Sequence, residues 1–174
     1  QSREIREVGA DKQLTVLSYL KKSGLKIQLT SNGKNPQVLE KIMEKSLADK
    51  LIMEVCGPSE IYPGILGEEI SPDDIAASLK QATRGSDYQF ETTIAPLVRS
   101  DDMVSYLTAE EVGATAKMIE EATGSKKHPY KLCACDLSKV EDVRLQEVEP
   151  LNAASMFKYR TAARRFMVMT EIEK

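Results

Sequence analysis

The sequence has 174 residues, 41% of them hydrophobic and 29% charged, a composition typical of one globular domain of ordinary size. Its net charge of −3, from 24 Lys and Arg against 27 Asp and Glu, provides no broad cationic field for nucleic acid or an anionic membrane. No apolar run approaches the roughly 20 residues that span a bilayer, and residues 1–11 lack the apolar core of a signal peptide. We therefore expect neither nucleic acid nor a membrane among its partners.

Helical and strand patterns alternate along the chain. Helices are predicted where a capping residue precedes apolar residues spaced three and four apart. They start at residues 11, 36, 72, 109 and 152. Strands are predicted over residues 25–30, 51–56, 88–96, 128–135 and 165–172. Residues 59–70 form a loop longer than the usual connection of roughly 4–6 residues, which makes it a candidate functional loop.

Strands separated by helical crossovers pair in parallel, so the order of elements predicts the α/β class. The whole chain, residues 1–174, is expected to form a single domain, with residues 151–174 as its last helix and strand. The chain starts on a helix without a strand before it, and its first residue is Gln1, not Met. These features predict a parallel-stranded partial (β/α) barrel that is truncated on its N-terminal side.

The predicted strands have one polar and one apolar face, whereas strands buried on both sides read as continuous apolar runs. The polar face contains Lys26, Gln28, Thr30, Ile52, Glu54, Cys56, Gln89, Glu91, Thr93, Lys131, Cys133 and Cys135. Because charged groups are costly to bury unpaired, we expect this face to line a wet, ligand-holding lumen. Lys26 and Lys131 opposite Glu54 and Glu91 would compensate charge in part. The alternative is a sheet covered on one side, with its polar face in bulk water.

Ligands of parallel α/β proteins bind at the carboxyl ends of the strands. Here those ends carry hydroxyls, carboxylates and thiols, with Gly or Pro at the exits, which suits a polar ligand such as a nucleoside or an amino acid. The Gly-rich run that cradles a pyrophosphate is absent from the sequence.

Four of these segments carry a family likeness: LTSNGKNP, then LIMEVCGP, a Tyr-containing loop ending in ILG, and FETTIAP. Their order and spacing resemble the motifs D-T-N-G-x-N-P, M-D-x-K-x-P and R-T-T-V-x-P of the radical S-adenosylmethionine superfamily. The likeness is closest to activating enzymes of glycyl-radical enzymes, and the tail LQEVEPL to ARRFMVMTEIEK is similar to their last helix and strand. It covers nearly the whole chain.

The resemblance implies a partial (β/α)6 barrel that uses S-adenosylmethionine and a [4Fe-4S] cluster to generate a 5′-deoxyadenosyl radical for hydrogen abstraction. It implies a glycyl-radical enzyme, such as an anaerobic reductase or a formate lyase, as partner, and flavodoxin or ferredoxin as electron donor. By carry-over, the first motif faces the ribose and adenosine, and Glu54 faces amino or ribose groups. The implied cofactor-binding residues are Thr30, Ser31, Asn32, Glu54, Cys56, Glu91 and Thr93.

The sequence departs from the family pattern at several positions. The cluster-binding C-x3-C-x2-C is absent, and the resemblance places it upstream of Gln1, so no metal ligand and no catalytic residue is assigned. Thr30 replaces the Asp before T-N-G, Glu54 and Cys56 replace the Asp and Lys of the next motif, and Glu91 replaces the Arg of R-T-T. Two alternatives therefore stay open. One is a catalytically inactive module that binds S-adenosylmethionine or a partner, and the other is an unrelated barrel acting on sugar phosphates or carboxylic acids.

Other residues have simpler interpretations. The three cysteines are too few for a disulfide framework, which indicates a reducing, cytoplasmic location, and Cys133 and Cys135 read as two sheltered thiols. His128 is expected at a strand entry, without a catalytic role. Glu54 is either a site carboxylate or an ion-pair partner of Lys26.

Two surface features remain. Three arginines of the last helix form a solvated face, with partner docking left open: Arg160, Arg164 and Arg165. The open barrel edge predicts self-association.

Overall fold

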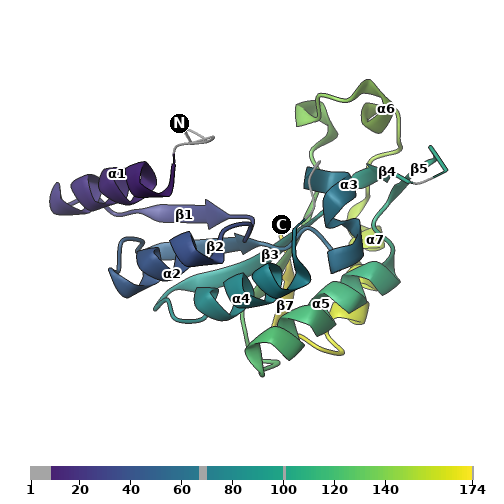
Figure 1. The fold of residues 1–174 in the computed structure, drawn as a ribbon. Coiled ribbons are helices and arrows are strands. Elements are labelled where there is room, and N and C mark those ends of the chain that lie inside the picture. The colour runs from purple at the N-terminus through teal and green to yellow at the C-terminus, as the bar shows by residue number, and fades with distance from the viewer. Residues whose placement is uncertain (1–8, 67–69, 100, 174) are drawn as a thin grey trace.

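The computed structural model describes residues 9–66, 70–99 and 101–173. At the centre of this described part lies a five-stranded parallel sheet with the spatial order β1-β2-β3-β6-β7 (Figure 1). Its strands are β1 (Gln28–Ser31), β2 (Lys50–Glu54), β3 (Tyr88–Ile94), β6 (Tyr130–Ala134) and β7 (Thr170–Ile172). Every neighbouring pair is parallel, so the predicted α/β class is confirmed.

One side of the sheet is covered by a layer of helices. The longer helices are α1 (Ala10–Lys22), α2 (Pro36–Glu44), α4 (Pro72–Ala82), α5 (Ala109–Thr123) and α7 (Ala153–Ala163). Figure 1 shows α2, α4 and α5 below the sheet, with α7 next to α5 and α1 at the β1 end. Consecutive members of this layer contact each other in chain order. In the part of the chain that the structure describes, no helix is long and apolar enough to cross a membrane.

The helix-facing side of the sheet carries the main hydrophobic core. Its buried strand side chains occupy alternate positions, as the period of two requires. They are Leu51, Met53, Val55, Phe90, Ile94, Tyr130 and Leu132. Each is at most 1% exposed and packs against α2, α4, α5 or α7, for example against Leu39, Leu79 and Ile119. Burial of one such side chain stabilises the fold by about 1.5–3 kcal/mol, so this face cannot be exposed to water.

Side-chain caps determine where the helices of this layer begin. Each predicted N-cap side chain accepts a hydrogen bond from a backbone N–H in the first turn of its helix: Asn35, Ser71, Thr108 and Asn152. At the start of α4 the donor is the N–H of Asp73, one residue before the predicted partner Asp74. At the start of α5, Thr108 and Glu111 form the complete capping box that the sequence predicts.

Several short elements differ from the predictions. The predicted loop over 59–70 contains η1 (Ser59–Ile61) and α3 (Tyr62–Leu66), and its residues 67–69 lie outside the described residues. An antiparallel hairpin of β4 (Pro96–Val98) and β5 (Val104–Tyr106) follows β3, and η2 (Leu137–Lys139) and α6 (Val143–Gln146) follow β6. The predicted strand over 165–172 begins at residue 170, because the N–H groups of Phe166 and Met167 donate to the carbonyl of Ala163 and prolong the turn of α7. Elements of three to five residues are too short for a periodic pattern to reveal them.

A smaller hydrophobic cluster joins α1 to α2, and Asp49 anchors it. The Asp49 carboxylate accepts hydrogen bonds from the Lys21 Nζ atom (2.6 Å), the Lys26 Nζ atom (3.3 Å) and the Ile27 N–H (2.8 Å). These bonds, chiefly that from Lys21, lower the pKa of Asp49 to about 2. One carboxylate thus ties the end of α1 and the start of β1 to the turn before β2. Of the two alternatives for Glu54, the ion pair with Lys26 is wrong, because Lys26 precedes β1 at the amino edge of the sheet and pairs with Asp49.

Replacing Asp49 with Asn is expected to lower the thermal unfolding midpoint at neutral pH, because an amide cannot replace the charge that both lysines contact. The folded-state pKa lies below the unfolded value of 3.8, so the stabilisation is complete above that value and is lost as the pH falls towards 2. Unfolding scans of both proteins between pH 7 and pH 2 should therefore converge at the acid end. A constant difference across this range would contradict the assigned role of Asp49.

Candidate functional site

The polar side chains of the strands lie on the side of the sheet opposite the main core. Neighbouring residues in a parallel register point the same way, and the register forms a row of charged residues across four strands. From β2 to β7 this row is Glu54, Glu91, Lys131 and Glu171. We call it the charged row. One step towards the carboxyl ends, Thr93 of β3 lies beside Cys133 of β6. The predicted common polar face is therefore observed for residues of β2, β3 and β6, whereas Lys26 lies before β1 and Cys56 packs against the main core. Three of the four residues in the charged row are carboxylates.

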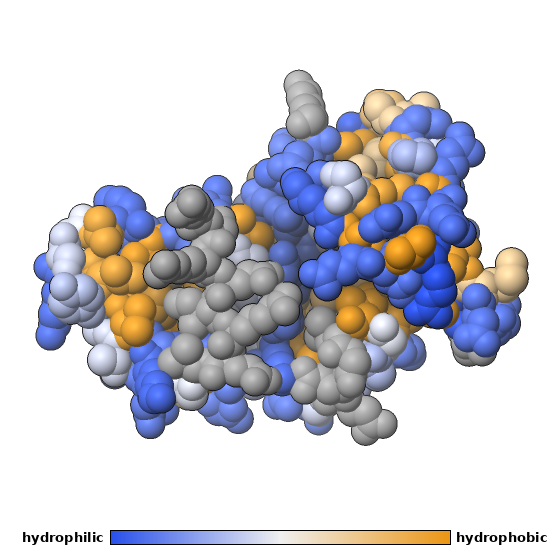
Figure 2. Space-filling model, turned by 90° about the horizontal axis from the view of Figure 1, so that it is seen from above, coloured by the Kyte–Doolittle hydropathy of each residue, from blue (hydrophilic) through white to orange (hydrophobic). Residues whose placement is uncertain are grey.

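The predicted enclosed lumen is not formed by the described residues. Gln28, Thr30, Glu54 and Thr93 are exposed, and β1 and β7 lie at opposite edges of the five-stranded sheet and do not meet. Figure 2 views the molecule from above and shows a hydrophilic hollow between an apolar patch at one end and a larger apolar area at the other. Over the described residues the polar face is thus an open, wet surface, which agrees with the high cost of burying three carboxylates together.

At the end of β1, two of the predicted site residues stabilise their own turn. The Ser31 hydroxyl accepts a hydrogen bond from the Gly33 N–H (3.2 Å), and the Asn32 Oδ1 atom accepts one from the Lys34 N–H (3.2 Å). Gly33 has a φ of +75°, and a Cβ atom there would lie 2.2 Å from the Met53 Cε atom, so only glycine fits. Thr30, in contrast, is exposed on the polar face. Of the three residues predicted from this motif, Thr30 is the one whose position suits a ligand on that face.

At the end of β2, Glu54 is exposed on the polar face, whereas Cys56 packs against the main core. Burial, with a smaller effect of the Glu54 charge, raises the pKa of Cys56 to about 11. The thiol is therefore neutral at physiological pH and provides neither a positive charge nor a thiolate. Tyr62 of α3 is fully buried near Cys56, and burial raises the pKa of its hydroxyl. The candidate functional loop is thus anchored to the core by its tyrosine.

At the ends of β3 and β6, the polar face combines carboxylates with a sheltered thiol. The Gln89 Nε2 atom donates to the Glu91 Oε2 atom (3.2 Å), and the Lys131 Nζ atom lies 3.6 Å from the Glu173 Oε1 atom. Cys133 is 6% exposed, and burial together with the carboxylates of Glu173 and Glu91 raises its pKa. The interpretation of Cys133 as a sheltered thiol therefore agrees with its surroundings. The ion pair of Lys131 with Glu173 was not predicted from the sequence.

Beneath the polar face, a buried hydrogen-bond chain links three strands. The Tyr130 hydroxyl donates to the Thr92 Oγ1 atom (2.8 Å), and the Thr92 hydroxyl donates to the Val55 carbonyl (2.6 Å). All three residues are at most 1% exposed. Buried polar groups that are fully satisfied make a core rigid. This chain links the start of β6 to the middle of β3 and to the residue after β2, on the core side of Glu54 and Glu91.

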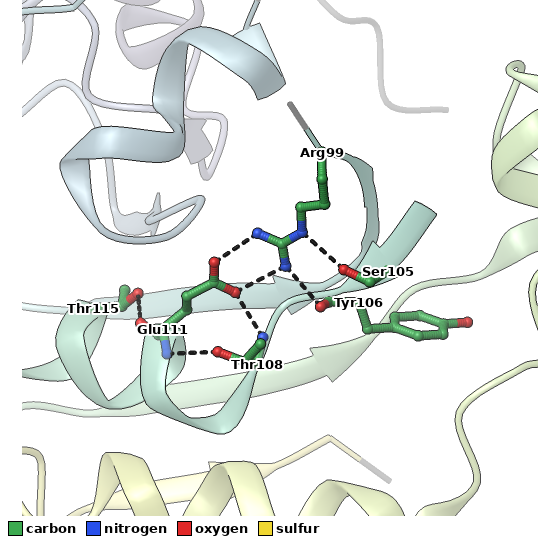
Figure 3. A network of polar contacts seen from close by, with 6 residues as sticks. All are labelled: Arg99, Ser105, Tyr106, Thr108, Glu111 and Thr115. Carbon is green, nitrogen blue, oxygen red and sulfur yellow. Dashed lines mark hydrogen bonds and ion pairs between the residues drawn. The ribbon is translucent and has the colours of Figure 1, made fainter. Parts of the chain in front are cut away.

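The hairpin beside these strand ends is attached to α5 by the Arg99 guanidinium (Figure 3). Its Nη1 and Nη2 atoms donate to the two carboxylate oxygens of Glu111 at 2.6 and 3.0 Å. Its Nε atom donates to the Ser105 hydroxyl (2.8 Å), and its Nη2 atom also donates to the Tyr106 carbonyl (2.9 Å). The Arg99 bond, with smaller effects of Thr108, holds the pKa of Glu111 below its usual value. The capping box was predictable from sequence, but the role of Arg99 was not.

The remaining candidates do not form a metal or catalytic site in the described residues. Within residues 9–66, 70–99 and 101–173, no group of three His, Cys, Asp or Glu side chains is arranged to hold a metal ion. His128 lies just before β6 at the amino edge of the sheet, where its Nδ1 atom is 2.6 Å from the Tyr88 hydroxyl, and burial lowers its pKa. Its predicted position at a strand entry is confirmed. The side chains that the structure describes therefore do not form a site for a [4Fe-4S] cluster.

Comparisons with known proteins agree with the observed topology. No protein-family model and no curated protein sequence matches the chain. Seven chains of solved structures match it, among them a domain of pyruvate-formate lyase-activating enzyme from Bacteroides vulgatus ATCC 8482. The TM-score is 0.64 at 8% sequence identity, and the match covers 95% of this chain and 91% of that chain. The predicted parallel partial barrel is therefore confirmed as the fold. At this identity the likeness establishes the fold alone.

Replacing Glu111 with Gln is expected to destabilise the protein by about 1–2 kcal/mol, a typical value for a lost charge-assisted hydrogen bond at a half-buried site. Gln at this helix position still serves a capping box, so the variant removes mainly the ion pair with Arg99. Urea unfolding measures the effect. Glu110→Gln, one residue earlier in the same turn of α5, is the matched control and should unfold like the wild type. Equal stability of the two variants would show that the Arg99 pair does not fasten the hairpin.

Proposed function

We propose that the polar face of this chain binds S-adenosylmethionine as part of a radical S-adenosylmethionine enzyme. The observation that carries the proposal is a pair of neighbouring carboxylates on the polar face. Glu54, the last residue of β2, and Glu91, in the middle of β3, lie side by side in the register, with Lys131, Glu171 and Glu173 farther along the same face. S-adenosylmethionine carries a sulfonium and an ammonium cation against one carboxylate, so its net charge is positive, and the two neighbouring carboxylates suit both its cations and its ribose hydroxyls.

The same charge pattern argues against the other ligand classes. A sugar phosphate or a carboxylic acid would place its negative charge beside these carboxylates, which is unfavourable at short range. A nucleotide polyphosphate would also lack the glycine-rich turn that supplies backbone N–H donors. Within the nucleoside and amino-acid class that the strand ends suit, a cationic member is therefore favoured.

The residues would act by binding and orientation. Glu54 and Glu91 accept hydrogen bonds from the ribose or the ammonium group, and the hydroxyls of Thr30 and Thr93 donate and accept at either end of this pair. The buried chain from Tyr130 to Val55 links the strands that carry this pair. When bound, S-adenosylmethionine supplies a 5′-deoxyadenosyl group for hydrogen abstraction, and the resemblance names a glycyl-radical enzyme as the molecule acted on. Ser31, Asn32 and Cys56 remain predicted cofactor contacts, although their observed roles are in a turn and in the core.

The three cysteines, Cys56, Cys133 and Cys135, are not arranged as ligands of a [4Fe-4S] cluster. In the described part of the chain, no group of three His, Cys, Asp or Glu side chains is placed to hold a metal ion. The proposal therefore assigns to Glu54, Glu91, Thr30 and Thr93 the binding of S-adenosylmethionine, and it assigns no iron ligand to the described cysteines. A binding module without its own cluster is the second candidate, and the separation of these thiols favours it.

Titration calorimetry of the chain with S-adenosylmethionine tests the proposal. Glu54→Gln and Glu91→Gln should each weaken binding about 10-fold, the effect of one lost charge-assisted hydrogen bond at an exposed site. Glu171→Gln is the matched control, because it makes the same change in the charged row at the far edge of the sheet. S-adenosylhomocysteine, which lacks the sulfonium charge, should bind more weakly than S-adenosylmethionine. Absence of binding, or equal losses in all three variants, would overturn the proposal.

Reconstitution with iron and sulfide separates the two candidates. An iron–sulfur absorption band with S-adenosylmethionine cleavage favours the enzyme, with ligands outside the described cysteines. Binding of S-adenosylmethionine without such a band favours the module.

A further inference from the structure

Helix α7 and the turn after it carry positive side chains and no acidic ones. Between residues 150 and 170 the chain contains four cations and no Asp or Glu, although its net charge is −3. The cations are Lys158, Arg160, Arg164 and Arg165. None of the four forms an ion pair with a described residue, whereas lysines on α1, at the start of β1 and on β6 do. This charge is therefore available on the surface.

Helical spacing brings two of these cations to one stripe with an aromatic ring. Phe157, Arg160, Thr161 and Arg164 follow the i, i+3, i+4, i+7 pattern, so they share one side of α7. The adjoining side of the helix is buried in the core through Met156, Tyr159 and Ala163, and Arg160 at the border between the two sides is half-buried. We call the four-residue stripe the α7 docking face. It points away from the sheet and is distinct from the polar face at the strand ends.

The side chains of the docking face are held in position before any partner binds. The Arg160 guanidinium lies 4.9 Å from the centroid of the Phe157 ring, and Phe157 is 52% exposed. The Arg164 Nε atom donates to the Thr170 carbonyl (3.1 Å), while its Nη groups make no hydrogen bond to the described residues. A fixed guanidinium with free Nη donors matches the bidentate geometry of a carboxylate. Little side-chain entropy would then be lost on binding.

We propose that the α7 docking face binds an acidic surface of a partner protein. Arg and Phe are enriched in protein interfaces, and stacked Arg–aromatic pairs are typical of their central residues. Together with Lys158 and Arg165 the segment has four cations, a small charge for a nucleic-acid site, and one exposed ring offers too little apolar area for insertion into a membrane. Charge complementarity therefore selects a partner that presents carboxylates around an apolar position. This inference does not rest on the proposed function.

A synthetic acidic peptide rich in Glu, Asp and Leu serves as the probe, with the full chain immobilised for interferometry. Binding should weaken with added salt, and Arg160→Glu with Arg164→Glu should weaken it at least about 10-fold. Lys12→Glu with Lys22→Glu on α1 is the control, since it makes the same change in net charge elsewhere and should have a smaller effect. Equal effects of the two double variants would overturn the proposal.

A second variant keeps the test valid if the double charge reversal perturbs α7. Phe157→Ala removes an exposed ring, and circular dichroism should show an unchanged fold while peptide binding weakens about 5-fold. A single-stranded oligonucleotide and vesicles containing phosphatidylglycerol complete the design. If the oligonucleotide or the vesicles bind more tightly than the peptide, and the Arg160→Glu with Arg164→Glu variant weakens that binding, the proposal of a protein partner is wrong.

Discussion

The parallel register of the central sheet is the constraint on which the rest of the structure depends. It places the apolar side chains of β2, β3 and β6 on one face and the charged row on the other. A slip of one residue would move Glu54 and Glu91 into the core and expose Met53 and Phe90, which would cost several kcal/mol for each misplaced group. Helices can therefore cover only the apolar face. The polar face must meet water or a ligand, whatever the chemistry of the protein is.

This constraint separates residues that serve the fold from residues available to a ligand. Gly33 is required by the left-handed turn after β1 and by the Met53 side chain below it, and Ser31 and Asn32 cap that same turn. The likeness of the TSNG segment to a family motif is therefore partly a likeness of turns, which two proteins with one fold share at low sequence identity. Glu54 and Glu91, by contrast, belong to no turn or cap and lie on the polar face of the sheet. The proposed function therefore depends on these two carboxylates more than on the motif.

The helices were predictable from sequence because their signals are local. Asn35, Thr108 and Asn152 cap helices whose apolar spacing is regular, and Gly124 ends α5 with a positive φ. The pairing of charged groups was not predictable, because it depends on how far each strand extends. Lys26 was expected inside a strand opposite Glu54, but β1 starts at Gln28. Lys26 therefore lies before the strand, where its Nζ atom donates to the Asp49 carboxylate. Arg99 is the same case, since its partners Ser105 and Glu111 become neighbours only after an unpredicted hairpin folds back.

The distribution of charge also connects the candidate site with the α7 docking face. The polar face is mainly acidic and α7 is cationic, so an acidic protein would be repelled from the first surface and attracted to the second. A cationic small molecule would behave in the opposite way. The two surfaces therefore need not compete, and both kinds of ligand could be held at once. Because α7 packs against β6 and leads directly into β7, a partner on its outer face would rest on the same strands that carry Lys131 and Glu171. Binding at one surface is then separated from the other by α7 and the sheet, in which the buried hydrogen bond of Tyr130 to Thr92 links β6 to β3.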